Sequence, residues 1–208
     1  MKTAANALSV LLHPVWMPTL TIAICFAIDP FLRYGFTRDG VWILYGMVFT
    51  MTAFFPLLSA LLMRRTGMVT DITMPQRMER IPAYFITLLY HGMCYYLLWR
   101  TNMHPDLLAI FLGALVALIA LLVITFRWKI SAHMTGIGGL IGSVVALMLE
   151  HGAYAPLLLC ALFVVAGALG TARLIASDHS PAQIYSGFLL GCSCTATSVL
   201  YGGSFPWN

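Results

Sequence analysis

Histidine and arginine side chains recur in three short polar stretches of this chain, at residues 71–82, 129–133 and 173–183. Arginine guanidinium groups match the oxygens of a phosphate and keep their charge, while histidine can attack phosphorus or transfer a proton near neutral pH. These residue types favour phosphoryl transfer, which depends mainly on positioning and charge neutralisation, so we expect neither a metal nor a cofactor at the site. The candidate residues are Arg77, Arg80, Ser131, His133, Arg173, Asp178, His179 and Gln183.

The composition indicates what kind of protein must hold these residues. Of the 208 residues, 61% are hydrophobic and only 9% are charged, whereas a soluble domain is about 25% charged. So few charges cannot cover the surface of a water-soluble monomer, and the sequence therefore predicts an all-α polytopic membrane protein. The net charge is +4, but the basic residues are spread between apolar blocks, which argues against nucleic acid as a partner.

Seven apolar runs are each long enough to cross a bilayer as a helix, whose backbone groups are satisfied internally. The connections between them are short, so we expect residues 1–208 to form a single integral membrane domain without a soluble part. The expected spans are Leu8–Ile28, Val41–Met63, Pro82–Trp99, Leu107–Phe126, Met134–Leu149, Ala155–Leu174 and Gln183–Leu200.

This span order places the three polar stretches on the same side of the membrane. The N-terminus and the connections at 64–81, 127–133 and 173–182 share what we call side A, and the remaining connections form side B. Side A holds eight of the eleven basic residues, which by the positive-inside rule would make it cytoplasmic. If four of those residues serve chemistry, the count becomes four against three, and the charges leave the orientation open.

Two local patterns within the spans indicate how the helices pack. Gly138-x-x-x-Gly142 and Gly187-x-x-x-Gly191 each place small residues on one helix face, which favours close helix approach inside a membrane. His13 lies between apolar residues in the first span and is followed by Pro14 and Pro18. The prolines predict a kinked helix, in which packing is the expected role of His13.

The polar stretches resemble the three sequence blocks of the type 2 phosphatidic acid phosphatase family, whose fold is shared with vanadium haloperoxidases. The family's third block is Ser-Arg, five residues, His, three residues and Asp, and this chain has Ala172-Arg173, five residues, His179, three residues and Gln183. Its Pro-Ser-Gly-His block corresponds to residues 130–133. Its first block, Lys, six residues and Arg-Pro, is matched least well, because only Arg80-Ile81-Pro82 corresponds to its end. The motif region is about 71–191, and the resemblance implies a six-helix core within the bundle.

The resemblance implies a role for each matched residue. His179 would be the nucleophile that forms a phosphohistidine, and His133 would be the general acid that protonates the leaving alcohol. Arg173 and Arg80 would hold the phosphate oxygens, with help from Ser131. Arg77 is the candidate for the missing lysine of the first block, because Thr73 occupies that position.

Gln183 is the main departure from the family pattern, because it replaces the Asp that orients the nucleophile. Gln183 can accept the same hydrogen bond but adds no charge, which could cost a few kcal/mol at the transition state, roughly as when the acid partner of a catalytic histidine is replaced. Asp178 is a second candidate for orienting His179. Ser180 and Gln183 also fit the capping box of a helix N-terminus, so Gln183 has a purely structural explanation as well.

The expected function is therefore hydrolysis of a lipid phosphate, with the headgroup at side A and the acyl chains in the bilayer. Phosphatidate, phosphatidylglycerol phosphate, undecaprenyl pyrophosphate and a lipid A phosphate all suit this geometry. The family resemblance implies the outer face of a bacterial inner membrane. Two alternatives stay open: a phosphotransferase that uses the same intermediate, and a non-catalytic carrier or lipid-binding protein that kept the pocket.

Overall fold

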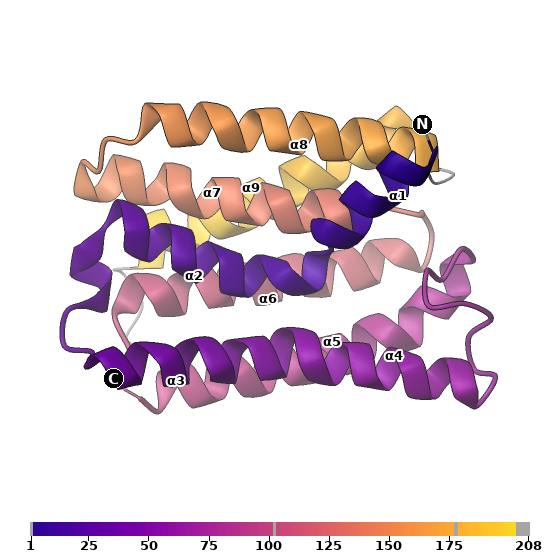
Figure 1. Ribbon diagram of the computed structural model, residues 1–208, viewed down its shortest axis with the longest axis horizontal. Coiled ribbons are helices and arrows are strands. Elements are labelled where there is room, and N and C mark those ends of the chain that lie inside the picture. Colours follow the sequence, from indigo (N-terminus) through magenta and orange to yellow (C-terminus); the bar gives the residue numbers. More distant parts are fainter. Residues whose placement is uncertain (1, 102, 177–178, 203–208) are drawn as a thin grey trace.

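A computed structural model describes residues 2–101, 103–176 and 179–202, and all of the regular structure in these ranges is helical (Figure 1). This architecture confirms the predicted all-α class. The helices are α1 Lys2–Leu11, α2 Met17–Ile28, α3 Arg38–Phe49, α4 Phe55–Arg65, α5 Arg77–Trp99, α6 Pro105–Thr125, α7 Ala132–His151, α8 Pro156–Ala176 and α9 Pro181–Gly202.

Among the described residues, seven helical segments are long and apolar enough to cross a membrane: Lys2–Ile28, Arg38–Arg65 and each of the helices α5 to α9. Their number and order confirm the predicted spans, although several begin earlier than expected. Large apolar side chains such as Leu89, Val123 and Val164 lie exposed on the outer surface. In water this surface would be unfavourable, whereas lipid covers it without cost. The chain therefore has the architecture of an integral membrane protein.

Two of the spans are broken helices. A 3₁₀ turn at Pro14–Trp16 separates α1 from α2, and Nδ1 of His13 accepts a hydrogen bond from the amide of Val15 at 3.4 Å. This break confirms the predicted kink. Between α3 and α4 the helix widens into a π turn at Thr50–Phe54. Pro56 follows it and has no N–H to donate to the preceding turn, a position at which such bulges form.

Helix α7 lies inside the bundle and contacts α2, α6, α8 and α9. The close helix approach predicted for its glycine motif is made with α9, whose own glycine motif lies at the same contact. A Cβ atom on Gly191 would collide with the carbonyl oxygen of Thr135, and one on Gly142 with that of Cys192. Only glycine permits this approach, and the Thr195 hydroxyl fixes it by donating to the Gly139 carbonyl at 2.8 Å.

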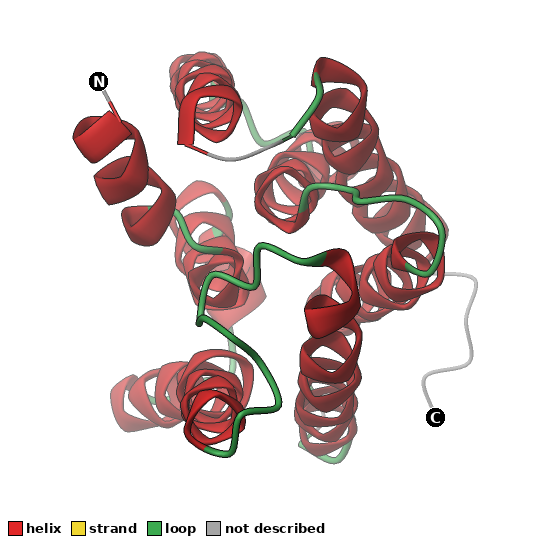
Figure 2. Ribbon diagram, turned by 90° about the vertical axis from the view of Figure 1, so that its right-hand side faces the viewer, coloured by secondary structure: helices red, strands yellow, loops and turns green. Residues whose placement is uncertain are grey.

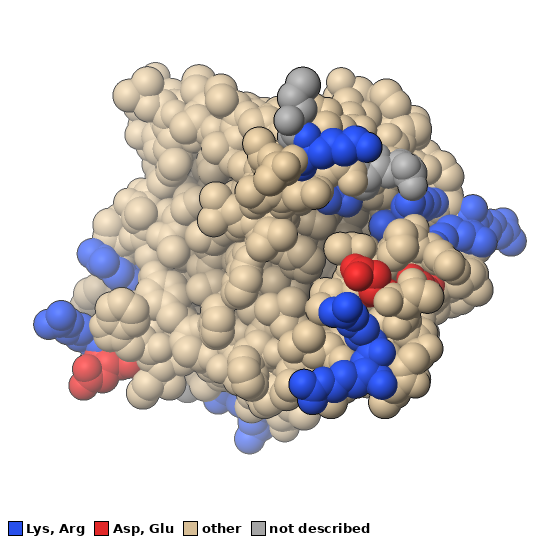
Figure 3. All heavy atoms as spheres, turned by 45° about the vertical axis from the view of Figure 1, so that its right-hand side comes forward, with Lys and Arg blue, Asp and Glu red and all other residues tan. Residues whose placement is uncertain are grey.

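The close contact between α7 and α9 also aligns their N-terminal ends. The amide of Ser131 donates to the carbonyl of Gln183 at 3.3 Å, which joins the two helix starts at side A. Figure 2 looks onto this end of the bundle, where the connections that follow α4 and α6 also lie. Charged side chains gather toward the two ends of the bundle and leave an uncharged belt between them (Figure 3). The fold thus brings the three polar stretches to one end, as expected.

Candidate functional site

A cavity of about 240 Å³ extends from side A toward the middle of the bundle, between α2, α5, α6 and α7. It collects residues from all three polar stretches and from the first span. Neither Asp nor Glu is found among the described residues that line it, so the charges facing the cavity are positive. The polar residues that line it include His13, Arg80, Tyr84, Thr87, His91, His133, Thr135, Arg173 and His179.

His179 lies two residues before the start of α9 and is only 7% exposed. Its Nδ1 lies 3.1 Å from Oε1 of Gln183, and the amide of Ser180 donates to the same oxygen at 3.1 Å. Because a backbone N–H needs an acceptor, the second contact supports the assignment of this Gln183 atom as oxygen. Nδ1 of His179 is therefore the protonated nitrogen, and Nε2 carries the lone pair.

The surroundings of His179 keep its imidazole uncharged. Burial lowers the pKa of His179 to about 4, and the hydrogen bond to Gln183 only partly opposes this effect. The positive charges of Arg80, Arg173 and Lys129 lower the pKa further. At neutral pH the ring is thus a free base whose Nε2 can act as a nucleophile.

The amide of Gln183 donates to the Ser180 hydroxyl at 3.4 Å, while its side chain accepts from the Ser180 amide. These reciprocal bonds form the predicted capping box. Gln183 therefore serves the helix start and the orientation of His179 at once, and the structural and functional explanations are compatible.

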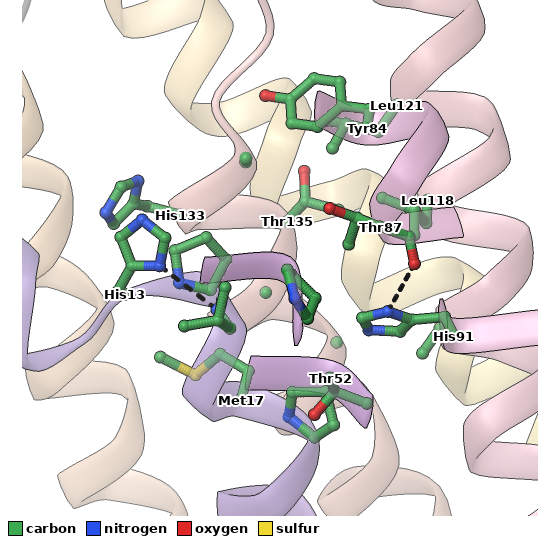
Figure 4. A pocket seen from close by; sticks show the side chains of 18 of the residues that line it. His13, Met17, Thr52, Tyr84, Thr87, His91, Leu118, Leu121, His133 and Thr135 are labelled. Carbon is green, nitrogen blue, oxygen red and sulfur yellow. Dashed lines mark hydrogen bonds between the residues drawn. The ribbon is translucent and has the colours of Figure 1, made fainter. Parts of the chain in front are cut away.

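His133 is the second residue of α7 and is held by the first helix. Its Nε2 lies 3.0 Å from the carbonyl oxygen of Ser9, so Nε2 carries a proton and donates it. The ring also meets His13 edge to face, with 5.1 Å between the ring centroids (Figure 4). His13 is therefore part of the site as well as of the kink. Its position inside an apolar span was the available signal for this role.

Arg80 and Arg173 supply the charge of the cavity. Arg80 lies in the first turn of α5, is only 8% exposed, and donates from Nε to the carbonyl of Met74 at 2.9 Å. This bond fixes the side chain without using the two terminal nitrogens, which are the ones that bind an anion bidentately. Arg173, in the last turn of α8, is close enough for the two positive charges to repel each other. An anion between them would relieve this repulsion.

Arg77 and Ser131 lie outside the lining of the cavity. The guanidinium of Arg77 donates to the carbonyls of Thr125 at 3.3 Å and of Phe126, at the C-terminal end of α6. A cation is favourable there, because the last helical carbonyls lack partners. In this arrangement Arg77 lies away from the cavity, and its expected phosphate-binding role stays a prediction.

Ser131 uses its amide in the bond to Gln183, and its hydroxyl is fully buried without a hydrogen-bond partner among the described residues. In this arrangement neither group reaches the cavity, so the expected help from Ser131 in phosphate binding is not part of the observed site. Asp178, the second residue expected to orient His179, lies outside the described residues.

Two further residues lie in the cavity without having been predicted, because they belong to an apolar span. Tyr84 lies one helical turn after Arg80, and His91 lies deeper along α5 (Figure 4). Nδ1 of His91 lies 3.0 Å from the Thr87 carbonyl, so this ring is bound to its own helix. The spacing of Tyr84 from Arg80 was the one usable signal, since residues four apart share a helix face.

Beyond its polar end the cavity is largely apolar. His91 comes eleven positions after Arg80 along α5, which corresponds to about 16 Å of helix length. A ligand with a charged head and a hydrocarbon tail matches this division. The apolar lining includes Met17, Leu57, Ala60, Ile86, Phe111 and Leu118.

Comparison with protein-family models, with curated proteins and with solved structures found no match for this chain. The resemblance of the three polar stretches to the phosphatase family therefore stays a prediction, and any function assigned to the chain must be argued from the cavity and its residues.

Proposed function

We propose that this chain is a membrane phosphatase that hydrolyses lipid phosphates through a phosphohistidine. The observation that carries the proposal is that His133, His179, Arg80 and Arg173, from four separate segments, line one cavity. No carboxylate lies among its described lining residues, and its deeper part is apolar. A phosphate headgroup with a hydrocarbon chain is the ligand class that this combination favours.

In the first step, Nε2 of His179 attacks phosphorus while the bond between phosphorus and the lipid alcohol oxygen breaks. The departing oxygen takes a proton from His133. Arg80 and Arg173 hold the phosphoryl oxygens, which neutralises their charge in the transition state. In the second step, water attacks the phosphohistidine, His133 accepts the proton of the water, and the phosphorus–nitrogen bond breaks to release inorganic phosphate.

His133 can carry the transferred proton without losing its anchor. Its Nε2–H donates to the carbonyl of Ser9, and this bond exists in the neutral ring and in the imidazolium alike. The proton that moves is therefore the one on Nδ1, which the neutral ring lacks. The first turn of α7 adds unpaired backbone amides and the positive end of the helix dipole, both of which favour an anion beside His133.

The position of the site suits a substrate that stays in the membrane. The polar end of the cavity is at side A, where a headgroup lies, and the apolar part reaches into the bundle. The family resemblance favours the outer face of a bacterial inner membrane for side A. Cysteines placed at Thr66 on side A and at Asp39 on side B test this orientation through labelling with an impermeant reagent.

A second candidate function is binding of a lipid phosphate without turnover. Gln183 favours it, because a neutral amide does not stabilise the positive charge that develops on His179 during attack. A phosphotransferase would use the same intermediate and pass the phosphoryl group to another alcohol in place of water.

Purified protein in detergent, with a chelator present, separates these functions. Phosphate release is measured with phosphatidate, phosphatidylglycerol phosphate, undecaprenyl pyrophosphate and a lipid A phosphate. We expect release from at least one of them, abolished in His179→Ala and His133→Ala and kept in the control Arg65→Ala, which changes an exposed side A arginine.

Release that is indifferent to both histidines would contradict the mechanism. Binding without release in the unmodified chain would favour the second candidate. Transfer of the phosphoryl group to an added alcohol would identify a phosphotransferase.

A further inference from the structure

A second cluster of histidines and carboxylates lies at side B, at the opposite end of the bundle from the cavity. Asp106 is in the first turn of α6 and is buried, and Glu150 and His151 end α7. Asp29 directly follows α2. These residues come from three connections that share no sequence motif, and the proposed phosphatase reaction uses none of them.

His151 is held between two carboxylates. Its Nδ1 is hydrogen-bonded to Oδ2 of Asp29, and its Nε2 lies 2.9 Å from Oδ2 of Asp106. Nδ1 of His104 lies 3.2 Å from the same Asp106 oxygen. Oδ2 of Asp106 is buried. Although two ring nitrogens lie near it, it accepts no hydrogen bond from any described residue. The short contact between Nε2 and Oδ2 therefore lacks the alignment of a hydrogen bond.

A shared metal ion explains this arrangement. Two ligand atoms of a tetrahedral zinc ion, each about 2.0–2.2 Å from the metal, lie about 3.3–3.6 Å apart. Nε2 and Oδ2 are 2.9 Å apart, so a movement of about half an ångström would open this pair to the separation that the ion requires. Three possible ligand atoms lie within 4.8 Å of one another, one each from Asp106, Glu150 and His151. Glu150 is exposed, so its carboxylate can close the remaining gap by changing its rotamer.

We propose that Asp106, Glu150 and His151 bind a divalent transition-metal ion, for which Zn²⁺ is the suitable probe. One imidazole with two carboxylates suits Zn²⁺, whereas Mg²⁺ and Ca²⁺ prefer oxygen ligands alone. Asp29 acts as the outer carboxylate that orients a metal-binding histidine through its second ring nitrogen. A surface pocket lined by Asp29, His104 and His151 leaves room for a water ligand.

The ion would join the ends of α6 and α7 and, through Asp29, the end of α2. Its role is therefore structural: it fixes the side B ends of three helices that form the wall of the cavity. Because a ligand that binds only the folded state stabilises it by mass action, zinc must raise the melting temperature.

The test uses the full chain in detergent, stripped with a chelator and then incubated with Zn²⁺. After desalting, bound zinc is measured by mass spectrometry, and thermal unfolding is recorded with and without the metal. We expect about one zinc ion per chain, lost in Asp106→Asn and His151→Gln. Glu150→Gln changes an exposed side chain and should weaken binding without disturbing the fold. Asp29→Asn should lower the zinc affinity about 10- to 100-fold, as for other outer partners.

Two controls define the site. Asp39→Asn removes another side B carboxylate, and His179→Ala removes a histidine of the cavity; both should keep the zinc and its effect on the melting temperature. The proposal is wrong if the unmodified chain retains no zinc, or if the Asp106 and His151 variants bind it as well as the unmodified chain. Loss of zinc in His179→Ala would instead place the metal in the cavity.

Discussion

The amide oxygen of Gln183 lies 3.1 Å from Nδ1 of His179. This contact fixes the tautomer of His179 and leaves Nε2 free for attack, but it brings no negative charge. The positive charge that forms on the ring during attack is therefore opposed by two arginines and balanced by no acid among the described cavity-lining residues.

Gln183→Glu tests the cost of this missing charge. Glutamate keeps the length of the side chain, and it is a normal partner in a capping box. The carboxylate should stabilise the imidazolium and raise kcat about tenfold, a fraction of what an acid partner supplies to other catalytic histidines. Steady-state phosphate release measures this change. Gln183→Ala removes both the hydrogen bond to His179 and the side-chain part of the capping box, so it should lower the rate of phosphate release and the melting temperature. An unchanged rate in Gln183→Glu would mean that Gln183 acts only as a helix cap.

The pH dependence of the unmodified protein follows from the pKa of His179, which is about 4. Because nucleophilic attack needs the neutral ring of His179, kcat/KM should fall on the acidic side as the pH passes through about 4, while the need for a protonated His133 should lower it on the basic side. In Gln183→Glu the added charge raises this pKa, so the acidic limb should move to higher pH. Both pH profiles are recorded with the same substrate, so the ionisation of the substrate affects them equally and a shift between them comes from the protein. An acidic limb at the same pH in both proteins would show that His179 does not set it.

Stability should respond to the same group. The pKa of His179 is lower in the folded state than the ordinary value of 6.5, so the unfolded chain binds the proton more tightly. The contribution of this group to stability is complete above about pH 6.5 and is lost as the pH falls toward 4. Melting temperatures over this range should therefore fall less in His179→Ala than in the unmodified protein.

Hydropathy was sufficient to predict the spans, because the bilayer requires long apolar helices. The glycine motifs predicted close helix approach, because few residues allow backbones to come so near, but they did not predict that α7 and α9 would be the pair in contact. The capping box at Ser180 and the break at Pro14 were also readable, since both depend on local backbone chemistry. These features explain why the polar stretches meet at side A.

Four of the predicted residues line the cavity, but the sequence did not distinguish them from Arg77 and Ser131, which do not. Arg77 lies three residues before Arg80, yet it binds the carbonyls at the end of α6. That contact depends on where α6 ends, which a pattern of types and spacing does not contain. The cluster around His151 was missed for the same reason, because Asp29, Asp106 and His151 meet only through the packing of three helices.

Arg80→Lys and Arg173→Lys test whether the cavity binds a phosphate through paired donors. Lysine keeps the positive charge but lacks the planar fork of arginine. Loss of one charge-assisted hydrogen bond should raise KM about tenfold in each variant. Arg65→Lys, on the same side but exposed, should leave KM unchanged. Equal behaviour of the three variants would show that only the general positive charge of side A attracts the lipid.

Gly191→Ala tests the contact between α7 and α9, whose starts hold the two histidines of the proposed reaction. The new Cβ would meet the carbonyl of Thr135, which forces α9 away from α7 and should cost about 1–3 kcal/mol of stability. Phosphate release should fall with it, because His179 and His133 depend on this alignment. Gly92→Ala is the control, since its Cβ meets nothing within 4 Å, and the gain in helix propensity should make it neutral or slightly stabilising. A fully active Gly191→Ala would mean that the helix starts are positioned by other contacts.

His13 combines two contacts that a pair of substitutions can separate. Its Nδ1 caps the turn after α1, and its ring contacts the ring of His133 edge to face, with 5.1 Å between the ring centroids. Asparagine is a good capping residue without an aromatic ring, so His13→Asn should keep the melting temperature while phosphate release falls, because His133 loses a neighbour that restricts its orientation. His13→Ala removes both contacts and should lower stability and rate together. If His13→Asn releases phosphate at the unmodified rate, the edge-to-face contact is packing alone, and the Ser9 carbonyl suffices to position His133.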